Sequence, residues 1–231
     1  MKLLWMYDDL LDLYGDRGNI MMLCSRLKEC GYEPELERKS IGDDIDFSEY
    51  RFVYIGPGLI SNTIAALQDI HKRRAEIQAA IDGGTVFLVV GSAQILFCHE
   101  LQSVSGDAYQ GLGLFDVDLI EENTITAADI VCTCPEVPSG IYGFINNTVT
   151  ISYRNEPHWF DVTYRGQGCK LDDHIGLRRN NFFSTWLLGP LLVRNPDLMN
   201  YMLTVITGHP PMVDDRLERV AYTTLMRELG Q

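Results

Sequence analysis

The segment VFLVVGSAQILF, residues 86–97, has the outline of a buried strand that turns sharply into a helix. All residues from 86 to 90 are apolar and mostly β-branched or bulky, which is typical of a strand buried in a parallel sheet. In enzymes built around such a turn, a Ser or Cys stands at the apex and its reactive atom projects from the sheet. Here we predict Val90 at the apex, followed by a helix over 94–100, so the turn carries no nucleophilic atom at that position.

Two cysteine motifs could also do chemistry. Cys98 next to His99 resembles a nucleophile with its base, but adjacent residues of a helix point in different directions, which favours a packed thiol and a helix-end histidine. Cys132 and Cys134 are one residue apart and have no second pair or nearby His, so we expect no zinc or other metal site there.

The elements that must position these residues alternate between strand and helix through the first half of the chain. This pattern predicts a parallel sheet covered by helices on both faces. The predicted strands are 2–6, 33–38, 51–55 and 86–90, and the predicted helices are 19–31, capped by Asn19, and 62–82.

The second half favours a run of strands, with a tight turn at Asn146 and Asn147. Asn195 followed by Pro196 predicts a helix start in which Asn195 is the capping residue. The last predicted helix, 215–229, places an apolar stripe on one face, made of Leu217, Val220, Ala221, Thr224 and Leu225.

Composition limits the possible partners and the compartment. The 231 residues carry a net charge of −13, which repels a phosphate backbone, so we expect neither nucleic acid nor a membrane as a partner. No linker or repeat divides the chain, and we expect one domain over 1–231. The apolar runs are shorter than a membrane span, and the N-terminus reads as a strand, so we expect a cytoplasmic protein with reduced thiols.

Two glycine turns mark the expected site. Ligands of open α/β sheets bind beyond the carboxyl ends of the strands, and the turns Gly56-Pro57-Gly58 and Val90-Gly91-Ser92 lie at two such ends. Glycine lets backbone N–H groups approach a developing oxyanion closely. The alternative is that both are simple strand-to-helix turns.

Six stretches occur in the order seen in one protein family: DLYGDRGNI at 12–20, YIGPG at 54–58, VVGSAQIL at 89–96, GLGLFD at 111–116, GFINN at 143–147 and STWLLGPLLVRNPDL at 184–198. On these motifs the chain resembles the CobB/CobQ-type class I glutamine amidotransferases. Within them it is most similar to the glutaminase subunit (GatD) of lipid II isoglutaminyl synthase. The resemblance spans almost the full length and implies an α/β fold, with a mostly parallel central sheet flanked by helices in a flavodoxin-like, three-layer arrangement.

The resemblance implies a cysteine nucleophile in a Cys-Gly-Gly-Tyr-Gln pattern and a later histidine in a Tyr-Leu-His-Gly-Pro pattern. Gly91 and Gln94 match the first pattern, which puts Val90 in the cysteine position. The later Gly-Pro pair puts Leu188 in the histidine position. Valine and leucine cannot donate, accept or attack, so we expect the standard glutaminase mechanism to be lost.

Two further positions depart from the family. Its Glu-Asn-His-Gly-Gly segment falls on Ile145-Asn146-Asn147-Thr148-Val149, and an arginine associated with binding the substrate falls on Ile125. Most of the polar side chains that the resemblance implies for the site are therefore absent from this sequence.

We therefore expect a non-catalytic partner of a Mur-ligase-like amide synthetase in cell-wall precursor amidation. It would use no cofactor, and glutamine or a related amide is a further possible ligand. The expected ligand-binding residues are Gly56, Gly58, Gly91, Ser92, Gln94 and Asn146.

Two alternatives stay open. An active amidotransferase or hydrolase could use Ser92 as a relocated nucleophile with His174 as its base, although moving the apex would misplace Gln94 and the helix start. A small-amide sensor is the second alternative. The loop at 12–20 is our expected contact or pocket-lining segment, unless Asp16 and its neighbours only fix the loop and cap the helix.

Overall fold

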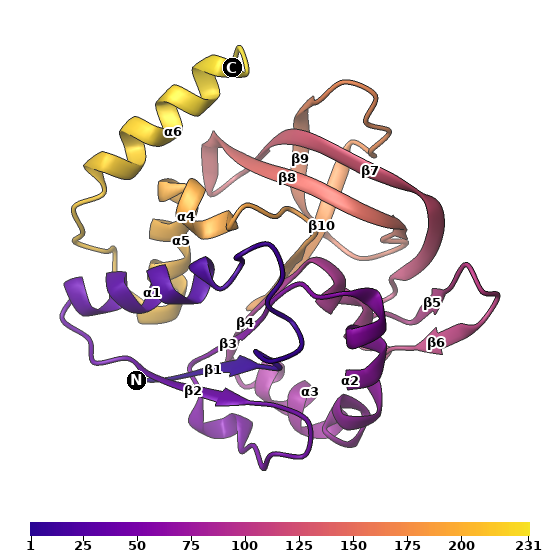
Figure 1. Ribbon diagram of the computed structural model, residues 1–231. Helices are drawn as coiled ribbons and strands as arrows, with labels where there is room; N and C mark the ends of the chain where they lie inside the picture. Colours follow the sequence, from indigo (N-terminus) through magenta and orange to yellow (C-terminus); the bar gives the residue numbers. More distant parts are fainter.

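The computed structural model describes residues 1–231, and an 11-stranded sheet runs through them with helices packed on both sides (Figure 1). The strand order is β2-β1-β3-β4-β11-β10-β9-β7-β5-β6, and β8 pairs with β7. The strands are β1 (Lys2–Met6), β2 (Glu35–Lys39), β3 (Phe52–Ile55), β4 (Val86–Val90), β5 (Glu100–Gln102), β6 (Ala108–Gln110), β7 (Asp118–Cys134), β8 (Val137–Ser152), β9 (His158–Arg165), β10 (His174–Arg179) and β11 (Phe182–Thr185). The α-helices are α1 (Gly18–Glu29), α2 (Ile60–Lys72), α3 (Arg74–Asp82), α4 (Leu191–Arg194), α5 (Pro196–Thr207) and α6 (Arg216–Glu228), and short 3-10 helices lie at Phe47–Glu49 and Gly91–Leu96.

The central part of the sheet is parallel. Strands β2, β1, β3, β4 and β11 run in the same direction, and β3 and β4 are buried along their whole length. Successive residues of a strand point to opposite faces. On one face the strand side chains pack with α2 and α3, and on the other with α1, α4 and α5. This confirms the predicted three-layer α/β architecture, with helices on both faces of the parallel strands.

Beyond β11 the sheet continues through antiparallel pairs, except that β5 pairs parallel with β7. Strand β10 pairs antiparallel with β11 and with β9, and β9 pairs antiparallel with β7. The long strands β7 and β8 form a hairpin. Asn146 and Asn147 lie inside β8, opposite Ala127 and Thr126, so the predicted tight turn at these residues is wrong. Pairing along the whole length of β7 overrides the local turn preference of the two asparagines.

Three helix predictions also need correction. The predicted helix 62–82 is two helices, because Arg73 leaves helical geometry at φ −103° and ψ 6°. The segment after Gly91 is a 3-10 helix that ends at Leu96, not a helix over 94–100. Helix α1 begins at Gly18, and Asn19 does not cap it, since its side-chain oxygen accepts a hydrogen bond from the Leu192 N–H at 2.7 Å.

Helix α5 begins at Pro196, as predicted, but Asn195 does not cap it through its side chain. The buried Asn195 amide instead accepts from the Tyr142 N–H at 2.7 Å and donates to the Tyr142 and Leu191 carbonyls at 2.7 and 2.8 Å. The Asn195 side chain thus bonds both backbone groups of Tyr142, as a neighbouring strand would, and links α4 and α5 to β8.

The final helix, α6, forms where the sequence predicts it and lies at the edge of the molecule (yellow in Figure 1). None of its side chains is buried. Its packed side includes Glu218, which pairs with Arg26 at 2.5 Å, and Tyr222, which donates to the Ser139 carbonyl at 2.7 Å. None of the helices in the chain combines the length and apolar character needed to cross a membrane.

Replacing Asn195 tests this link between the helices and β8. Asn195→Ala leaves the buried Tyr142 N–H and carbonyl without partners, so we expect the free energy of unfolding to fall by roughly 2–3 kcal/mol. Urea unfolding followed by circular dichroism measures the change. Asn155→Ala is the matched control, because Asn155 is exposed and bonds only the Asp116 carboxylate. Equal effects of the two variants would contradict the assigned role.

Candidate functional site

The turn after β4 differs from the predicted geometry. Val90 is the last residue of the strand, with φ −118° and ψ 139°, and the positive φ of the turn, +61°, falls on Gly91. The apex is therefore Gly91, one residue later than predicted, because a β-branched residue is disfavoured at positive φ whereas glycine adopts it freely. Val90 is fully buried.

No side chain fits at the apex of this turn. A Cβ placed on Gly91 would lie 2.7 Å from the Pro57 Cβ and 3.4 Å from a Leu188 methyl group. Leu188 is buried in the same hydrophobic cluster as Val90, on the same side of the sheet. Its backbone exchanges two hydrogen bonds with Phe144 of β8, at 2.8 and 3.0 Å. The direction in which a side chain at Gly91 would project is thus blocked by Pro57.

The second turn is fixed by Ser92. The Ser92 hydroxyl accepts from the Gly58 N–H at 2.9 Å and donates to the Gly58 carbonyl at 2.8 Å, while the Thr63 hydroxyl donates to it at 3.1 Å. The Gly58 N–H, which could have served as an oxyanion donor, is therefore engaged within the protein.

A cavity of about 490 Å³ opens beside the two turns. Four of the residues expected to bind ligand line it: Gly58, Gly91, Ser92 and Asn146. Ile125 and Asn147, at positions where the resemblance implies an arginine and a histidine, also line it, and so do Thr148 and Leu188. The other lining residues are Leu13, Tyr14, Pro57, Leu59, Ile60, Ser61, Ile64, Ser103, Glu121 and Trp186.

Two expected ligand-binding residues do not line the cavity. A Cβ on Gly56 would lie 2.8 Å from the Leu11 carbonyl oxygen, so this glycine allows two backbone segments to pack closely. The buried Gln94 side chain accepts from the Trp186 indole N–H at 3.1 Å and from the Tyr153 hydroxyl at 3.2 Å. Gln94 thus supports the wall of the cavity from behind through Trp186.

Comparison with known proteins agrees with this architecture. The model of the CobB/CobQ-like glutamine amidotransferase domain matches residues 2–196. The chain belongs to this family. Two curated relatives are the GatD subunits of the glutamine-hydrolysing lipid II isoglutaminyl synthases of Streptococcus pneumoniae and Staphylococcus aureus. The first is 25% identical over 203 residues, covering 86% of this chain and 77% of the relative. The second is 25% identical over 195 residues, covering 84% and 79%.

Solved structures share the fold of this CobB/CobQ-like chain. A glutamine amidotransferase from Thermotoga maritima has a TM-score of 0.52 at 10% identity, with 99% of this chain and 91% of that chain covered. The PurLQS structure from the same organism has a TM-score of 0.50 at 12% identity, with 97% and 98% covered. At these identities the likeness concerns the fold alone.

Ser92 and His174 do not form a nucleophile and base pair in this family member. Ser92 lines the 490 Å³ cavity, whereas His174 lines a neighbouring cavity of about 100 Å³. The His174 Nδ1 contacts the Asp161 carboxylate at 2.8 Å. The Ser92 hydroxyl instead bonds the Gly58 backbone and the Thr63 hydroxyl. Neither group is a base that could take the proton of the hydroxyl.

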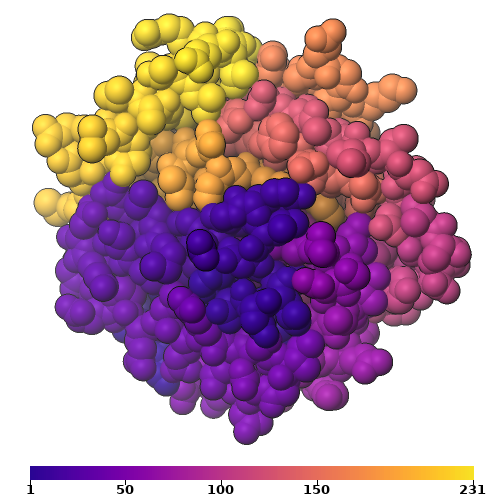
Figure 2. Space-filling model, in the orientation of Figure 1, coloured from indigo at the N-terminus to yellow at the C-terminus, as the bar shows by residue number.

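The loop before α1 contributes to the cavity wall. Leu13 and Tyr14 line the cavity, and the Asn146 amide of β8 donates to the Tyr14 hydroxyl at 3.3 Å. In Figure 2 the indigo N-terminal residues lie across the middle of the surface, next to orange residues of the C-terminal half. Sequence reasoning identified the loop but not Tyr14, because an exposed aromatic residue in a loop carries no spacing signal.

Asp16 of the same loop is buried and cannot contact a partner. Its carboxylate accepts hydrogen bonds from the Tyr54 hydroxyl and, at 2.9 Å, from the Asn19 amide. Burial raises the pKa of Asp16 to about 7, although both hydrogen bonds oppose the rise. Asp16 and Asn19 therefore fix the loop, which is the alternative interpretation given above. Arg17 is exposed and lies beside Asp12.

All six cysteines are free thiols, and three of them, Cys98, Cys132 and Cys134, are buried. Cys98 donates to the Ile95 carbonyl at 3.1 Å, and burial raises the pKa of its thiol to about 12. Burial also raises the pKa of Cys134 to about 11 and that of Cys132 further. A buried thiol with a raised pKa is a poor nucleophile, which favours the packing roles expected for these residues.

Asp16 makes the stability of the chain depend on pH. The folded state keeps a proton on this carboxyl up to pH about 7, whereas the unfolded chain loses it near pH 3.8. The stabilisation is therefore complete below pH 3.8 and is lost as the pH rises towards 7 and above. Relative to Asp16→Asn, the free energy of unfolding of the wild type should fall across this window by on the order of 2–4 kcal/mol.

Urea unfolding at pH 4, 5, 6, 7 and 8 checks this expectation. Asp9→Asn is the control, because it makes the same substitution at an exposed carboxyl. Parallel profiles for the wild type and Asp16→Asn would show that Asp16 is not protonated in the folded chain.

Proposed function

We propose that this chain is a glutamine amidotransferase-like subunit that has lost glutaminase activity. The observation that carries the proposal is the turn after β4, where the residue with positive φ is Gly91 and a side chain there would clash with Pro57. Cysteine and histidine are absent from the positions that the family resemblance assigns to them, Val90 and Leu188. The Gly58 N–H is also bonded to the Ser92 hydroxyl, so this donor is not free to stabilise an oxyanion.

The purified chain should release no ammonia from glutamine above the uncatalysed background. Loss of a nucleophile alone costs about 10⁶-fold in turnover in a serine protease, and we expect a comparable loss here. A coupled glutamate dehydrogenase assay, with and without the partner subunit, measures the release. Turnover that Ser92→Ala abolishes would overturn the proposal and support the relocated serine.

The double variant Val90→Cys/Leu188→His extends this test. Position 90 is fully buried and in extended geometry, so a thiol there lies in the core rather than at the apex. We therefore expect this variant to stay inactive while remaining folded. Measurable turnover in the double variant alone would show that the geometry of the turn is still competent, and that only the side chains were lost.

We further propose that the retained role is in a complex with a Mur-ligase-like amide synthetase that amidates a cell-wall precursor. Support comes from the curated relatives, which are named as subunits of a lipid II isoglutaminyl synthase. Free thiols at all six cysteines suit a reducing compartment, and we propose the cytoplasm as its location.

Helix α6 is the surface that we assign to this partner. It follows the residues matched by the family model, 2–196, and so adds to the shared domain. The predicted apolar stripe is largely exposed: Leu217 is 83% and Val220 66% exposed, and the preceding Met212 is 87% exposed. Ala221 and Thr224 are exposed on the same stripe, while Leu225 is half-buried. Exposed apolar residues gathered on one helix face are typical of a protein interface.

Substitutions on α6 test the partner and the surface together. Wild-type chain co-expressed with the Mur-ligase-like synthetase should co-elute in gel filtration at micromolar concentration. Leu217→Glu/Val220→Glu should weaken the complex by more than about tenfold, because it buries two charges in place of two apolar anchors. Gln167→Glu/Gln231→Glu adds the same charge at exposed positions outside α6 and should leave the complex intact.

Separate elution of the wild-type proteins would contradict the partner assignment. Unchanged co-elution of the stripe variant would contradict only the assignment of α6.

A second candidate function is binding of glutamine or a related small amide without hydrolysis. The favouring observation is the cavity, which places the Tyr14 hydroxyl, Glu121 and the Asn146 amide beside apolar walls. Calorimetry with glutamine separates the two functions, since a sensor binds the amide in the absence of any synthetase.

A further inference from the structure

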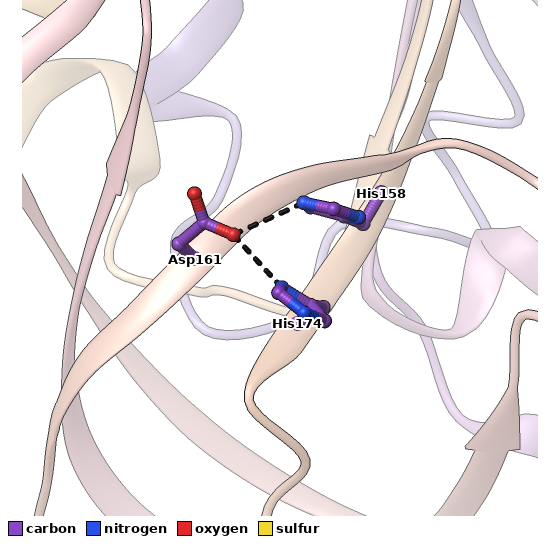
Figure 3. Close-up of side chains that lie close together, drawn as sticks. All are labelled: His158, Asp161 and His174. Atoms are coloured by element: carbon purple, nitrogen blue, oxygen red, sulfur yellow. Dashed lines mark hydrogen bonds and ion pairs between the residues drawn. The ribbon is translucent and has the colours of Figure 1, made fainter.

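Three side chains converge on the outer surface of the antiparallel part of the sheet (Figure 3). His158 and Asp161 belong to β9, and His174 is the first residue of β10, directly opposite Asp161. The His158 Nε2 and the His174 Nδ1 lie 3.0 and 2.8 Å from the same Asp161 oxygen, Oδ1. The two imidazole rings stack with centroids 4.0 Å apart and an interplanar angle of 24°.

We propose that His158, Asp161 and His174 form a binding site for a divalent transition-metal ion of the Zn²⁺ class. The donor set decides the class of ion: two imidazole nitrogens and one carboxylate oxygen suit Zn²⁺, Ni²⁺ or Cu²⁺ better than Mg²⁺ or Ca²⁺. All donor atoms lie within 4.8 Å of one another, so one ion can reach them all. The net charge of −13 adds a general attraction for cations.

The required rearrangement is small and local. Zn–N bonds of about 2.0–2.1 Å in tetrahedral geometry separate donor atoms by about 3.3 Å, so both nitrogens must move from Oδ1 by only a few tenths of an ångström. The rings must also splay from their stack, because a bound ion lies in the plane of each imidazole. The side chains of His158, Asp161 and His174 are 44, 51 and 56% exposed, which leaves them free to turn without moving the strands.

A bound ion would cross-link β9 and β10 near the residue pair His174 and Asp161, at one end of their ladder. Three protein donors leave one position of a tetrahedral site to water, and the exposure of the cluster opens that position to solvent. The site is separate from the 490 Å³ cavity, since none of the three residues lines it. It therefore does not depend on the proposed function of that cavity.

Calorimetric titration of the tag-free, metal-free chain with Zn²⁺ tests the proposal. We expect one ion per chain, and a loss of affinity of at least about tenfold in each of His158→Gln, Asp161→Asn and His174→Gln. Zn²⁺ should also raise the melting temperature of the wild type and not that of these variants. His99→Gln is the matched control, because His99 forms a similar exposed pair with Asp118 at 3.0 Å but has no second histidine.

Titration with Co²⁺ separates this site from binding by the free cysteines. Nitrogen and oxygen ligands give only weak visible bands, whereas thiolate ligands add strong charge-transfer absorption in the near ultraviolet. The absence of saturable binding, binding unchanged in the histidine variants, or a thiolate band would each overturn the proposal. Because the three residues are exposed, the metal-free variants should keep the wild-type melting temperature, and this measurement accompanies the titrations.

Discussion

The site depends on one close contact, the packing of the turn after β3 against the turn after β4. Gly91 can approach Pro57 only because it has no side chain and adopts positive φ. The Ser92 hydroxyl then holds the Gly58 backbone through both of its polar groups. A side chain added at Gly91 would meet Pro57 and must push the two turns apart, whereas loss of the Ser92 hydroxyl leaves the Gly58 N–H and carbonyl without these partners. The wall of the cavity and the absence of a projecting nucleophile thus have the same origin.

Other parts of the cavity rest on polar groups buried behind it. Asn19 joins the loop carboxylate of Asp16 to the backbone of Leu192, so the loop before α1 is tied to the segment that follows Leu188. Asn195 joins that same segment to β8, which carries Asn146 into the cavity. Side-chain amides therefore connect the loop, α4 and β8, three segments far apart in the sequence. These contacts stabilise a cavity whose own lining is mostly apolar.

The sequence predicts the parallel part of the sheet well, because its strands are continuous apolar runs that end in glycine turns. Strand β1 forms over the predicted residues, and β3 and β4 differ little or not at all from prediction. Prediction from the sequence fails where tertiary contacts determine the local structure. Asn146 and Asn147 favour turns but pair within β8. Asn195 precedes a helix, but its side chain bonds the backbone of Tyr142 instead of capping that helix. The shift of the apex from Val90 to Gly91 is a backbone property that motif spacing does not encode.

The position of β11 has a consequence for how the chain folds. This strand, residues 182–185, completes the parallel part of the sheet by pairing with β4, which ends about ninety residues earlier. Until it arrives, the apolar strand β4 has an unpaired edge, and the antiparallel strands cannot join the sheet through β10. During synthesis most of the chain therefore leaves the ribosome before β11 can pair with β4 in the centre of the sheet. The order of the strands makes the folding of this chain a late and cooperative event, dominated by contacts of high sequence separation.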